Sequence, residues 1–316
     1  MRIVFMGTAE FGVPTLRVLH EYHEVAAVVT GGETYRGRGR KLQPSPVKMA
    51  AKELGVPVFE PGNLSDHGFI TNLEEIRADL FFVVAFRILP KVVFTIPPKE
   101  TVNLHASLLP DYRGAAPINW AIINGDKTTG LTTFYIEESV DTGNIILNTE
   151  VSIGPDETAG ELAGRMKIIG ADLSLQTVDL IEKGTVTRIT QPLATPRPAP
   201  KLSKNDGRIN WAKDARSIHN QVRGMNPSPG AFTEWSQGVL KIHRTEIVDT
   251  ETPGTPGLIV ESSPKEGIIV SCFRGKLRII EVQLSGKRSM DGPSFVRGYR
   301  IKKGCLLHDN CMINDC

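Results

Sequence analysis

The sequence predicts an α/β protein in two parts, an N-terminal doubly wound, mostly parallel sheet and a small C-terminal β-barrel. In the first part, apolar strand-like runs alternate with stretches of helical spacing, which is the pattern of a parallel sheet covered by helices. A proline-rich stretch then leads into a series of short alternating runs divided by turn residues, which predicts the barrel. A chain of 316 residues has room for two such domains.

The N-terminal elements begin with a βαβ unit. Residues 2–6 form an apolar run that ends at Gly7, residues 11–19 have helical spacing, and residues 25–29 give a second strand. This order starts a doubly wound sheet. No Gly-x-Gly-x-x-Gly follows the first strand, and the sequence has no Gly-Lys-Ser/Thr loop. Dinucleotide binding and P-loop nucleotide binding are therefore not predicted.

The alternation of strands and helices continues through the first domain. The most apolar run, residues 79–86, is expected to be a central strand, because central parallel strands are buried on both faces. Residues 158–182 have the spacing of a long amphipathic helix that closes the domain. The other elements expected are helices at about 46–54 and 66–76, strands at 57–59 and 131–136, and a strand through Asn103 and His105.

The domain boundaries follow from the proline-rich stretch. Prolines at positions 196, 198 and 200 make residues 193–206 a stiff, extended linker. The predicted domains are therefore 1–192 and 207–304, and residues 305–316 are predicted to be a disordered tail. In the second domain we expect a helix at about 215–223 and short strands that include residues 239–243, 257–260, 268–272 and 277–282.

Charge is unevenly spread along the chain. From residue 201 onward there are 18 Lys and Arg against 12 Asp and Glu, while residues 1–200 have 19 against 23. The basic half suggests an anionic partner, although an excess of this size also fits an ordinary solvated surface. No apolar run approaches the ~20 residues that span a bilayer, and the N-terminus lacks the features of a signal peptide. We predict a cytoplasmic protein without a membrane partner.

The four cysteines do not indicate a metal site. Cys305, Cys311 and Cys316 lie near the C-terminus together with His308, and Cys272 stands apart. This spacing fits no zinc-binding pattern. We therefore expect no bound metal and a disordered, thiol-bearing tail.

The most informative stretch is residues 101–117. Asn103 and His105 are two residues apart on a predicted strand, so their side chains share one face, and an irregular loop follows at the strand end, where open α/β sheets bind their ligands. A neutral histidine moves protons near neutral pH. An asparagine donates a hydrogen bond to an oxygen that becomes negative during acyl transfer. Asp141, in a turn after residues 131–136, is the best candidate for an acid that orients His105.

Two interpretations of these residues stay open at this point. An Asn-x-His pair on a strand is often only a pair of satisfied polar groups. An Asp-Thr-Gly turn often only caps a loop. The residues alone therefore do not decide between catalysis and structure.

A second candidate site is the long glycine- and arginine-rich loop at residues 31–46. Its basic side chains suit phosphates, and its glycines allow the backbone to change shape on contact with a partner. A solvated, flexible loop is the alternative. The basic residues are Arg36, Arg38, Arg40 and Lys41.

Several motifs taken together resemble the formyltetrahydrofolate-dependent formyltransferases. They are Asn-Leu-His-Ala-Ser-Leu-Leu-Pro at 103–110, Tyr-Arg-Gly-Ala-Ala-Pro-Ile at 112–118, and Asp-Thr-Gly at 141–143. The resemblance runs from residue 1 to about residue 299. The loop at 37–48 resembles the one with which that family enters the acceptor stem of tRNA. The chain departs from the family's pattern at residues 31–36 and at Ser228, where the family commonly has tryptophan.

The resemblance implies a Rossmann-like formyltransferase domain followed by an OB-like, tRNA-binding barrel. It implies transfer of the formyl group of 10-formyltetrahydrofolate to the α-amine of initiator methionyl-tRNA, by an enzyme that we expect to be a monomer without an obligate protein partner. Asn103, His105 and Asp141 match the family's catalytic positions. The implied folate-binding residues are Phe86, Arg87, Ile88, Leu89, Ser107, Leu108, Leu109 and Pro110, and the implied tRNA-binding residues are Arg36, Arg38, Arg40, Lys41, Lys287 and Arg288.

Two other functions compete with this one. The first is a related formyltransferase or deformylase that acts on another amine, such as a nucleotide sugar, or on the folate itself. The basic loop and the basic second domain argue against it. The second is a non-enzymatic RNA-binding protein with a decayed catalytic domain. The presence of all three catalytic residue types argues against that.

Overall fold

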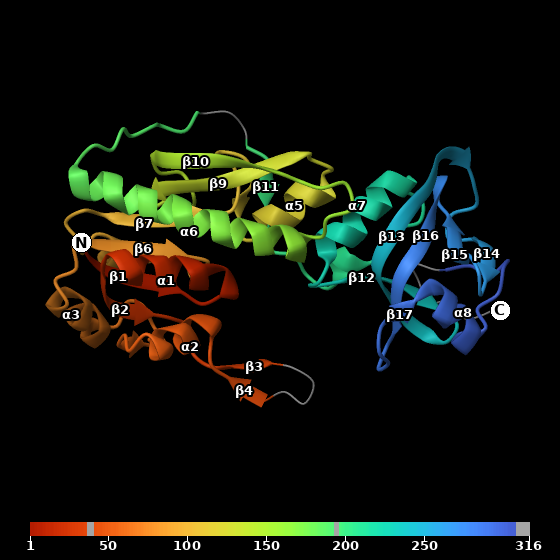
Figure 1. The fold of residues 1–316 in the computed structure, drawn as a ribbon, viewed down its shortest axis with the longest axis horizontal. Helices are drawn as coiled ribbons and strands as arrows, with labels where there is room; N and C mark the ends of the chain where they lie inside the picture. The colour runs from red at the N-terminus through yellow and green to blue at the C-terminus, as the bar shows by residue number, and fades with distance from the viewer. Residues whose placement is uncertain (37–40, 193–195, 308–316) are drawn as a thin grey trace. The chain divides into compact units, whose positions relative to one another are not determined.

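The computed structural model describes residues 1–36, 41–192 and 196–307, and the chain forms two compact units (Figure 1). The first unit consists of Met1–Pro117, Thr129–Ser152 and Ala163–Ala199. The second consists of everything from Pro200 onward together with two segments of the N-terminal half, Ile118–Thr128 and Ile153–Leu162. Among the described residues, no helix is both long enough and apolar enough to cross a membrane.

The first unit is built on a seven-stranded sheet in the order β10-β9-β7-β6-β1-β2-β5. Five of these strands run parallel to their neighbours, and β9 runs antiparallel to β7. The chain starts at β1 and builds outward on both sides of it, as the βαβ pattern predicts. The strands are β1 (Arg2–Gly7), β2 (Glu24–Val29), β5 (Val58–Phe59), β6 (Leu80–Val84), β7 (Thr101–His105), β9 (Thr128–Tyr135) and β10 (Ile145–Ser152).

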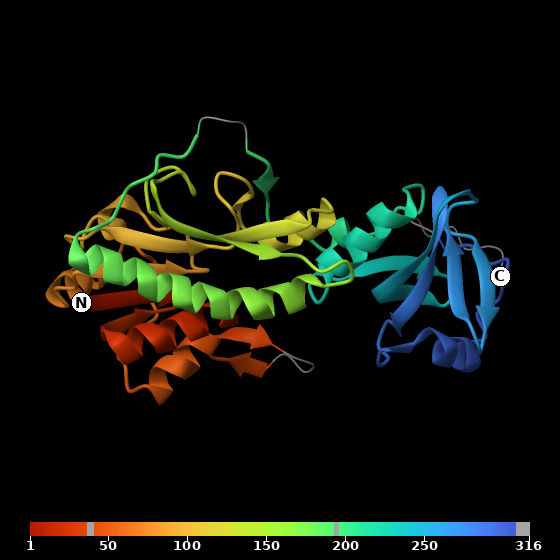
Figure 2. The same cartoon turned by 45° about the horizontal axis from the view of Figure 1, so that its top comes forward.

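Helices cover the sheet because its central strands are apolar on both faces. Every residue of β6 is buried, and side chains from α3 and α4 pack on the face that carries Val4 and Met6. Helix α6 packs on β7 and β9, where a side chain at Gly170 would meet Leu104 at 2.9 Å (Figure 2). The helical elements of this half are η1 (Glu10–Gly12), α1 (Val13–Tyr22), α2 (Pro46–Glu53), α3 (His67–Glu75), α4 (Lys91–Phe94), α5 (Pro117–Ile123) and α6 (Ala159–Lys183).

The segment at residues 31–46 differs from its prediction as a long loop. Strands β3 (Thr34–Arg36) and β4 (Lys41–Gln43) pair antiparallel and form a hairpin that stands out from the sheet (Figure 1, Figure 2). In this pairing, backbone N–H and C=O groups hydrogen bond to each other, whereas in an unpaired loop they would bond to water. Residues 37–40, which include Arg38 and Arg40, lie outside the described part of the chain, and so do the side chains of Arg36 and Lys41.

The second unit is an antiparallel sheet with helices, consistent with the predicted small barrel. Its strands follow the order β12-β13-β16-β15-β14, and β17 pairs with β16. The long strand β13 changes register with β16 at several bulges, which bend a sheet. The elements are η2 (Asn205–Gly207), α7 (Ala215–Met225), β12 (Ala231–Trp235), β13 (Gly238–Pro253), β14 (Ile259–Ser263), β15 (Gly267–Ser271), β16 (Arg274–Leu284), β17 (Met290–Asp291) and α8 (Gly292–Tyr299).

The ordered part of the second unit continues past residue 304, where the sequence analysis placed the start of a disordered tail. Cys305 and Leu307 are buried in the hydrophobic core of this unit, and Leu306 forms a bridge with Leu258. Apolar side chains at these positions complete the core. The remaining tail residues, including Cys311 and Cys316, lie outside the described part of the chain.

Candidate active site

The candidate site lies where β6 and β7 end side by side. Val83 pairs with Asn103 and Val84 pairs with Leu104, so the two parallel strands stop at the same edge of the sheet. The loops that follow, residues 85–90 and 106–116, leave the sheet at this edge. Leu104 is buried, as the alternation along the strand predicts. The edge therefore brings together the segments that the sequence singled out.

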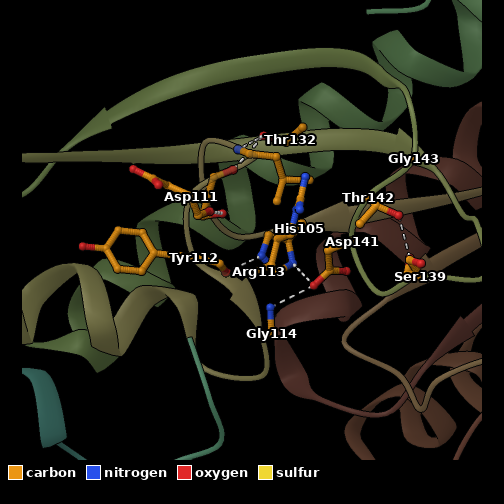
Figure 3. A network of polar contacts seen from close by, with 12 residues as sticks. His105, Asp111, Tyr112, Arg113, Gly114, Thr132, Ser139, Asp141, Thr142 and Gly143 are labelled. Carbon is orange, nitrogen blue, oxygen red and sulfur yellow. Dashed lines mark hydrogen bonds and ion pairs between the residues drawn. The ribbon is translucent and has the colours of Figure 1, made fainter. Parts of the chain in front are cut away.

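Both ring nitrogens of His105 face polar atoms of the protein (Figure 3). Nε2 lies 2.9 Å from the carbonyl oxygen of Tyr112, and because a carbonyl only accepts, Nε2 carries the hydrogen. In the neutral ring Nδ1 then holds the lone pair. The ring is 7% exposed and meets the edge of Phe134 with 6.5 Å between centroids. Nδ1 is therefore the atom of this ring that can take up a proton.

Asp141 lies beside that nitrogen, as the sequence analysis expected. Its Oδ2 is 3.8 Å from Nδ1 of His105 and accepts a hydrogen bond of 2.9 Å from the backbone N–H of Gly114 (Figure 3). The 3.8 Å separation is an ion-pair distance and is too long for a hydrogen bond. The carboxylate is thus fixed by one backbone donor and placed to stabilise an imidazolium.

The turn that carries Asp141 has an uncommon backbone. Asp141 itself has φ of 56°, in the left-handed region that few residues other than glycine adopt. Two residues later, a Cβ on Gly143 would meet the carbonyl oxygen of Tyr135 at 1.8 Å, so only glycine fits. The glycine of the Asp-Thr-Gly sequence is therefore required by the close approach of this turn to the end of β9.

The loop after β7 is held by Thr132, a residue that the sequence analysis missed. The Thr132 hydroxyl donates to the carbonyl of Ser107 at 2.7 Å and accepts from the backbone N–H of Leu109 at 3.2 Å. The Ser107 hydroxyl donates in turn to the carbonyl of Asp111. Thr132 pairs with His105 across the sheet, so its position could have been found by assuming that β9 lies next to β7.

Asn103 offers a side-chain amide that has no hydrogen-bond partner among the described residues. The residue is partly exposed, and no residue in the described part of the chain hydrogen bonds its side chain. It lies two positions before His105 on β7. An amide in this state is available to donate to a bound molecule.

The loop after β6 presents main-chain groups at the same edge. Arg87 ties it to a neighbouring turn by donating to the carbonyls of Pro61 and Gly62 at 2.8 and 3.2 Å. Within the described ranges, no hydrogen bond uses the main-chain groups of residues 86–89. Ile88 is 77% exposed, whereas Leu89 is buried. The loop thus combines a free apolar side chain with backbone donors and acceptors.

The other four predicted folate-binding residues contribute unequally. The side chains of Ser107 and Leu109 are buried, and Leu109 packs against Phe134 and Ile145. Leu108 and Pro110 are partly exposed. Ser107 and Leu109 therefore offer a ligand less accessible surface than Leu108 and Pro110 do.

The basic residues predicted for tRNA binding lie on two segments. Lys287 and Arg288 are exposed in the turn between β16 and β17, where the backbone N–H of Lys287 bonds to the carbonyl of Leu284 at 2.9 Å. Arg36 and Lys41 belong to the β3–β4 hairpin. Arg38 and Arg40 fall outside the described residues.

A group of potential metal ligands occurs elsewhere in the first unit. In the residues that the structure describes, the candidate ligand atoms of His23, Asp179 and Glu182 lie within 4.8 Å of one another. None of these residues is at the edge formed by β6 and β7.

Comparison with known proteins places both halves of the chain. The formyl transferase family matches residues 1–178, and the C-terminal domain of formyl transferases matches residues 201–300. The methionyl-tRNA formyltransferase of Pelotomaculum thermopropionicum is 44% identical over 98% of this chain and 100% of its own length. That of Clostridium acetobutylicum is 45% identical over 97% of this chain and 99% of its own length.

Solved structures share the fold at lower identity. An N-formyltransferase from Helicobacter canadensis, in complex with folinic acid and dTDP-3-aminofucose, covers 87% of this chain and 97% of its own with a TM-score of 0.66 and 21% identity. The sugar 3N-formyl transferase WlaRD, with dTDP and 5-N-formyl-THF, covers 91% and 99% with a TM-score of 0.65 and 19% identity. At these identities the likeness concerns the fold alone.

Proposed function

The chain belongs to the methionyl-tRNA formyltransferases of the formyl transferase family, and we propose that its formyl donor is 10-formyltetrahydrofolate and its acceptor the α-amine of initiator methionyl-tRNA. The product is N-formylmethionyl-tRNA, which starts translation. The proposal rests on the grouping of three residues at one sheet edge: His105, Asp141, and Asn103, whose amide has no partner among the described residues.

The reaction exchanges one C–N bond for another. The methionyl amine attacks the formyl carbon and gives a tetrahedral intermediate, and the bond from that carbon to N10 of the folate then breaks. Negative charge builds on the formyl oxygen. Asn103, whose side-chain amide has no partner among the described residues, donates to this oxygen. One such donor contributes ~10²–10³ in rate.

His105 moves the proton. The attacking amine must lose a proton on becoming an amide, and N10 must gain one as it leaves. Nε2 is bonded to the Tyr112 carbonyl, so Nδ1 takes up the proton and returns it. Asp141, 3.8 Å away, stabilises the positive charge while the ring holds that proton.

The folate lies along the loop after β6. The residues there fit a flat heteroaromatic ring, because the backbone of 86–89 has unused donors and acceptors and Ile88 offers an exposed apolar side chain. Phe86, Arg87, Ile88 and Leu89 form one wall, and residues 107–110 form the other. No metal takes part in the proposed steps.

The tRNA is held by phosphate contacts from two basic segments. Residues Arg36, Arg38, Arg40 and Lys41 belong to the hairpin segment, and Lys287 and Arg288 extend from the second unit. Arginine and lysine side chains suit the phosphate backbone of RNA, and those of Lys287 and Arg288 are exposed. These contacts position the acceptor end and do not take part in bond exchange.

A nucleotide-sugar acceptor is the other candidate, since one structural neighbour is a sugar 3N-formyl transferase and another is an N-formyltransferase in complex with dTDP-3-aminofucose. Their identities of 21% and 19% support the fold only, whereas the methionyl-tRNA formyltransferases match the chain at 44–45% over nearly its whole length. No observation at the site favours a sugar. Methionyl-tRNA is therefore the one acceptor that we propose.

A comparison of four acceptors tests this proposal. The full chain is mixed with 10-formyltetrahydrofolate and, in separate reactions, methionine-charged initiator tRNA, methionine-charged elongator tRNA, free methionine and a UDP-aminosugar. Formylation of the initiator tRNA with the highest kcat/KM is expected. Preferential formylation of the sugar, or formate release without an acceptor, would contradict it.

A further inference from the structure

The buried side chain of Gln191 joins the two segments that hold His105 and Asp141. Its Nε2 donates to the carbonyl of Asp141 at 3.0 Å and to the carbonyl of Gly143 at 2.9 Å. Its Oε1 accepts from the guanidinium of Arg113, at 2.5 Å from Nη2 and 3.2 Å from Nε. The residue is 6% exposed.

The amide has one workable orientation. A glutamine amide has two N–H donors and two acceptor positions, and here all four are used. Turning the amide over would set its NH₂ group against the guanidinium donors and its oxygen against two carbonyls. Both contacts would be repulsive, so the group acts as a fixed link.

The Gln191 amide connects the two segments that position His105 and Asp141, the catalytic pair. On one side it holds the turn that carries Asp141, whose left-handed φ of 56° costs energy and needs support from its surroundings. On the other side it holds Arg113. The residue before Arg113 supplies the carbonyl for His105, and the residue after it supplies the N–H for Asp141.

Gln191 belongs to the segment that leaves α6 and leads to the second unit. Just before it, Ile189 exchanges two backbone hydrogen bonds with Ile145, at 2.8 and 2.9 Å. Further along, the carbonyl of Arg197 accepts from the N–H of Tyr112, and β11 (Pro198–Ala199) pairs with β8 (Arg113–Gly114). The segment is therefore anchored on both sides of the catalytic pair.

We infer that Gln191 is a positioning residue, which sets the distance between His105 and Asp141 by fixing the 141–143 turn to the segment around Arg113. The inference rests on the catalytic roles proposed above for His105 and Asp141. Gln191 touches neither substrate nor reacting atoms. Its loss acts on catalysis because a displacement of about 1 Å in a catalytic group can lower the rate ~10²-fold.

The test uses Gln191→Glu in the full chain. Glutamate has the same shape and keeps its contact with Arg113, but it has no N–H to donate to the carbonyls of Asp141 and Gly143. We expect kcat for formylation of methionyl-tRNA to fall between ~10- and ~10²-fold, with KM for both substrates changed less than about twofold. Gln191→Asn, which keeps the amide but is one methylene shorter, serves if the glutamate variant does not fold.

The matched control is Gln221→Glu. Gln221 also donates its Nε2 to two backbone carbonyls, those of Asp206 and Arg208 at 2.9 and 3.0 Å, but it lies on α7 in the second unit. This variant loses a comparable pair of hydrogen bonds and should keep its kcat. An equal fall of kcat in both variants would mean that Gln191 matters only for stability, and the inference would be wrong.

A double variant separates this inference from the proposed function. If Gln191 acts through Asp141, adding Gln191→Glu to Asp141→Asn should change kcat by less than about twofold. A full further loss in the Asp141→Asn background would overturn the inference while leaving the role of Asp141 intact. Wild-type kcat in Asp141→Asn alone would instead remove Asp141 from the proposed mechanism.

Discussion

At the scale of single residues, the chemistry depends on how the two nitrogens of His105 are used. One is bonded to a backbone carbonyl at 2.9 Å, and the other faces the carboxylate of Asp141 at 3.8 Å. A proton taken up by the second nitrogen creates an ion pair in a buried place. The carboxylate charge is therefore the property of Asp141 that matters most.

Replacing Asp141 by asparagine removes that charge and keeps the size of the side chain. We expect the variant to fold normally, because the asparagine oxygen can still accept from the N–H of Gly114. Its kcat should fall ~10²-fold, the lower range for general acid–base catalysis. Stopped-flow formylation assays with circular dichroism as the folding control measure this. Turnover equal to that of the wild type would exclude Asp141 as the partner of His105.

Replacing Asn103 by alanine removes the proposed oxyanion donor. Because its amide has no partner among the described residues, stability should change little, while kcat falls ~10²–10³-fold. Asn103→Asp gives a matched comparison, since a carboxylate is similar in size but repels negative charge. Equal activity in the wild type and either variant would show that the developing charge is stabilised elsewhere.

The positions of the side chains at the site were predictable, and the backbone contacts were not. The spacing of Asn103 and His105 on an apolar strand was enough to place both at the sheet edge. The roles of the Tyr112 carbonyl and the Gly114 N–H could not be predicted from the sequence, because nearly every residue has these backbone groups. Gln191 is 50 positions from Asp141, so its contact follows only from the fold.

At the scale of elements, α7 carries a buried histidine whose titration affects stability. His219 Nδ1 lies 3.0 Å from the Thr245 hydroxyl, and Nε2 lies 3.3 Å from both the Pro155 carbonyl and an Asp156 carboxylate oxygen. Burial lowers the pKa of His219 below its usual 6.5, and Arg223 and Arg216 add to this, while the Pro155 carbonyl and Asp156 oppose it. The folded protein therefore prefers the neutral ring.

The stability of the fold depends on pH because the pKa of His219 is lower in the folded chain than in the unfolded chain. Below pH about 6.5 the unfolded chain binds a proton at His219 that the folded chain still excludes, so the free energy of unfolding falls as the pH falls. We expect His219→Gln to flatten this dependence between about pH 6.5 and the lowered folded pKa. Urea unfolding across this range measures it, with His67→Gln as an exposed-histidine control. An unchanged slope in His219→Gln would contradict the assignment.

Element types were predicted better than their extents. The helix expected at residues 158–182 is α6, Ala159–Lys183, because its apolar spacing is long and regular. The strand expected at 239–243 is the beginning of β13, which runs to Pro253. The later part of β13 was not predicted because most of its residues are polar and exposed, so it lacks the apolar alternation of a buried strand. Pairing with β16 makes this part a strand. The short β3–β4 hairpin was likewise hidden by its glycine-rich surroundings.

At the scale of the whole molecule, the compact units do not follow the linear order of the chain. The second unit takes in residues 118–128 and 153–162. Within it, Asn119 donates to the carbonyl of Gly224 at 2.8 Å, and Arg223 donates to the carbonyls of Gly154 and Glu157 at 3.2 and 3.3 Å. The proline-rich linker indicates where the chain leaves the first unit for the second. It gives no sign that two segments before the linker also belong to the second unit.

Ending the chain at residue 206 therefore removes only part of a compact unit. Ile123, which packs on the core of the second unit, would lose its partners, and the carbonyls of Gly154 and Glu157 would lose the hydrogen bonds that Arg223 donates to them. We expect a truncated protein that binds an apolar dye, aggregates and unfolds at lower temperature than the full chain. Calorimetry and light scattering compare the two. A soluble fragment with the Tm of the full chain would show that the two segments fold without α7.

The measurement that bears most directly on the proposed mechanism is single-turnover formylation by His105→Ala. With the enzyme in excess over methionyl-tRNA and saturated with 10-formyltetrahydrofolate, product release does not contribute, and tRNA affinity is measured in parallel by filter binding. The expected result is a rate at least ~10²-fold below that of the wild type with a nearly unchanged Kd for tRNA. A rate within a few-fold of the wild type would exclude His105 as the group that moves the proton in formyl transfer.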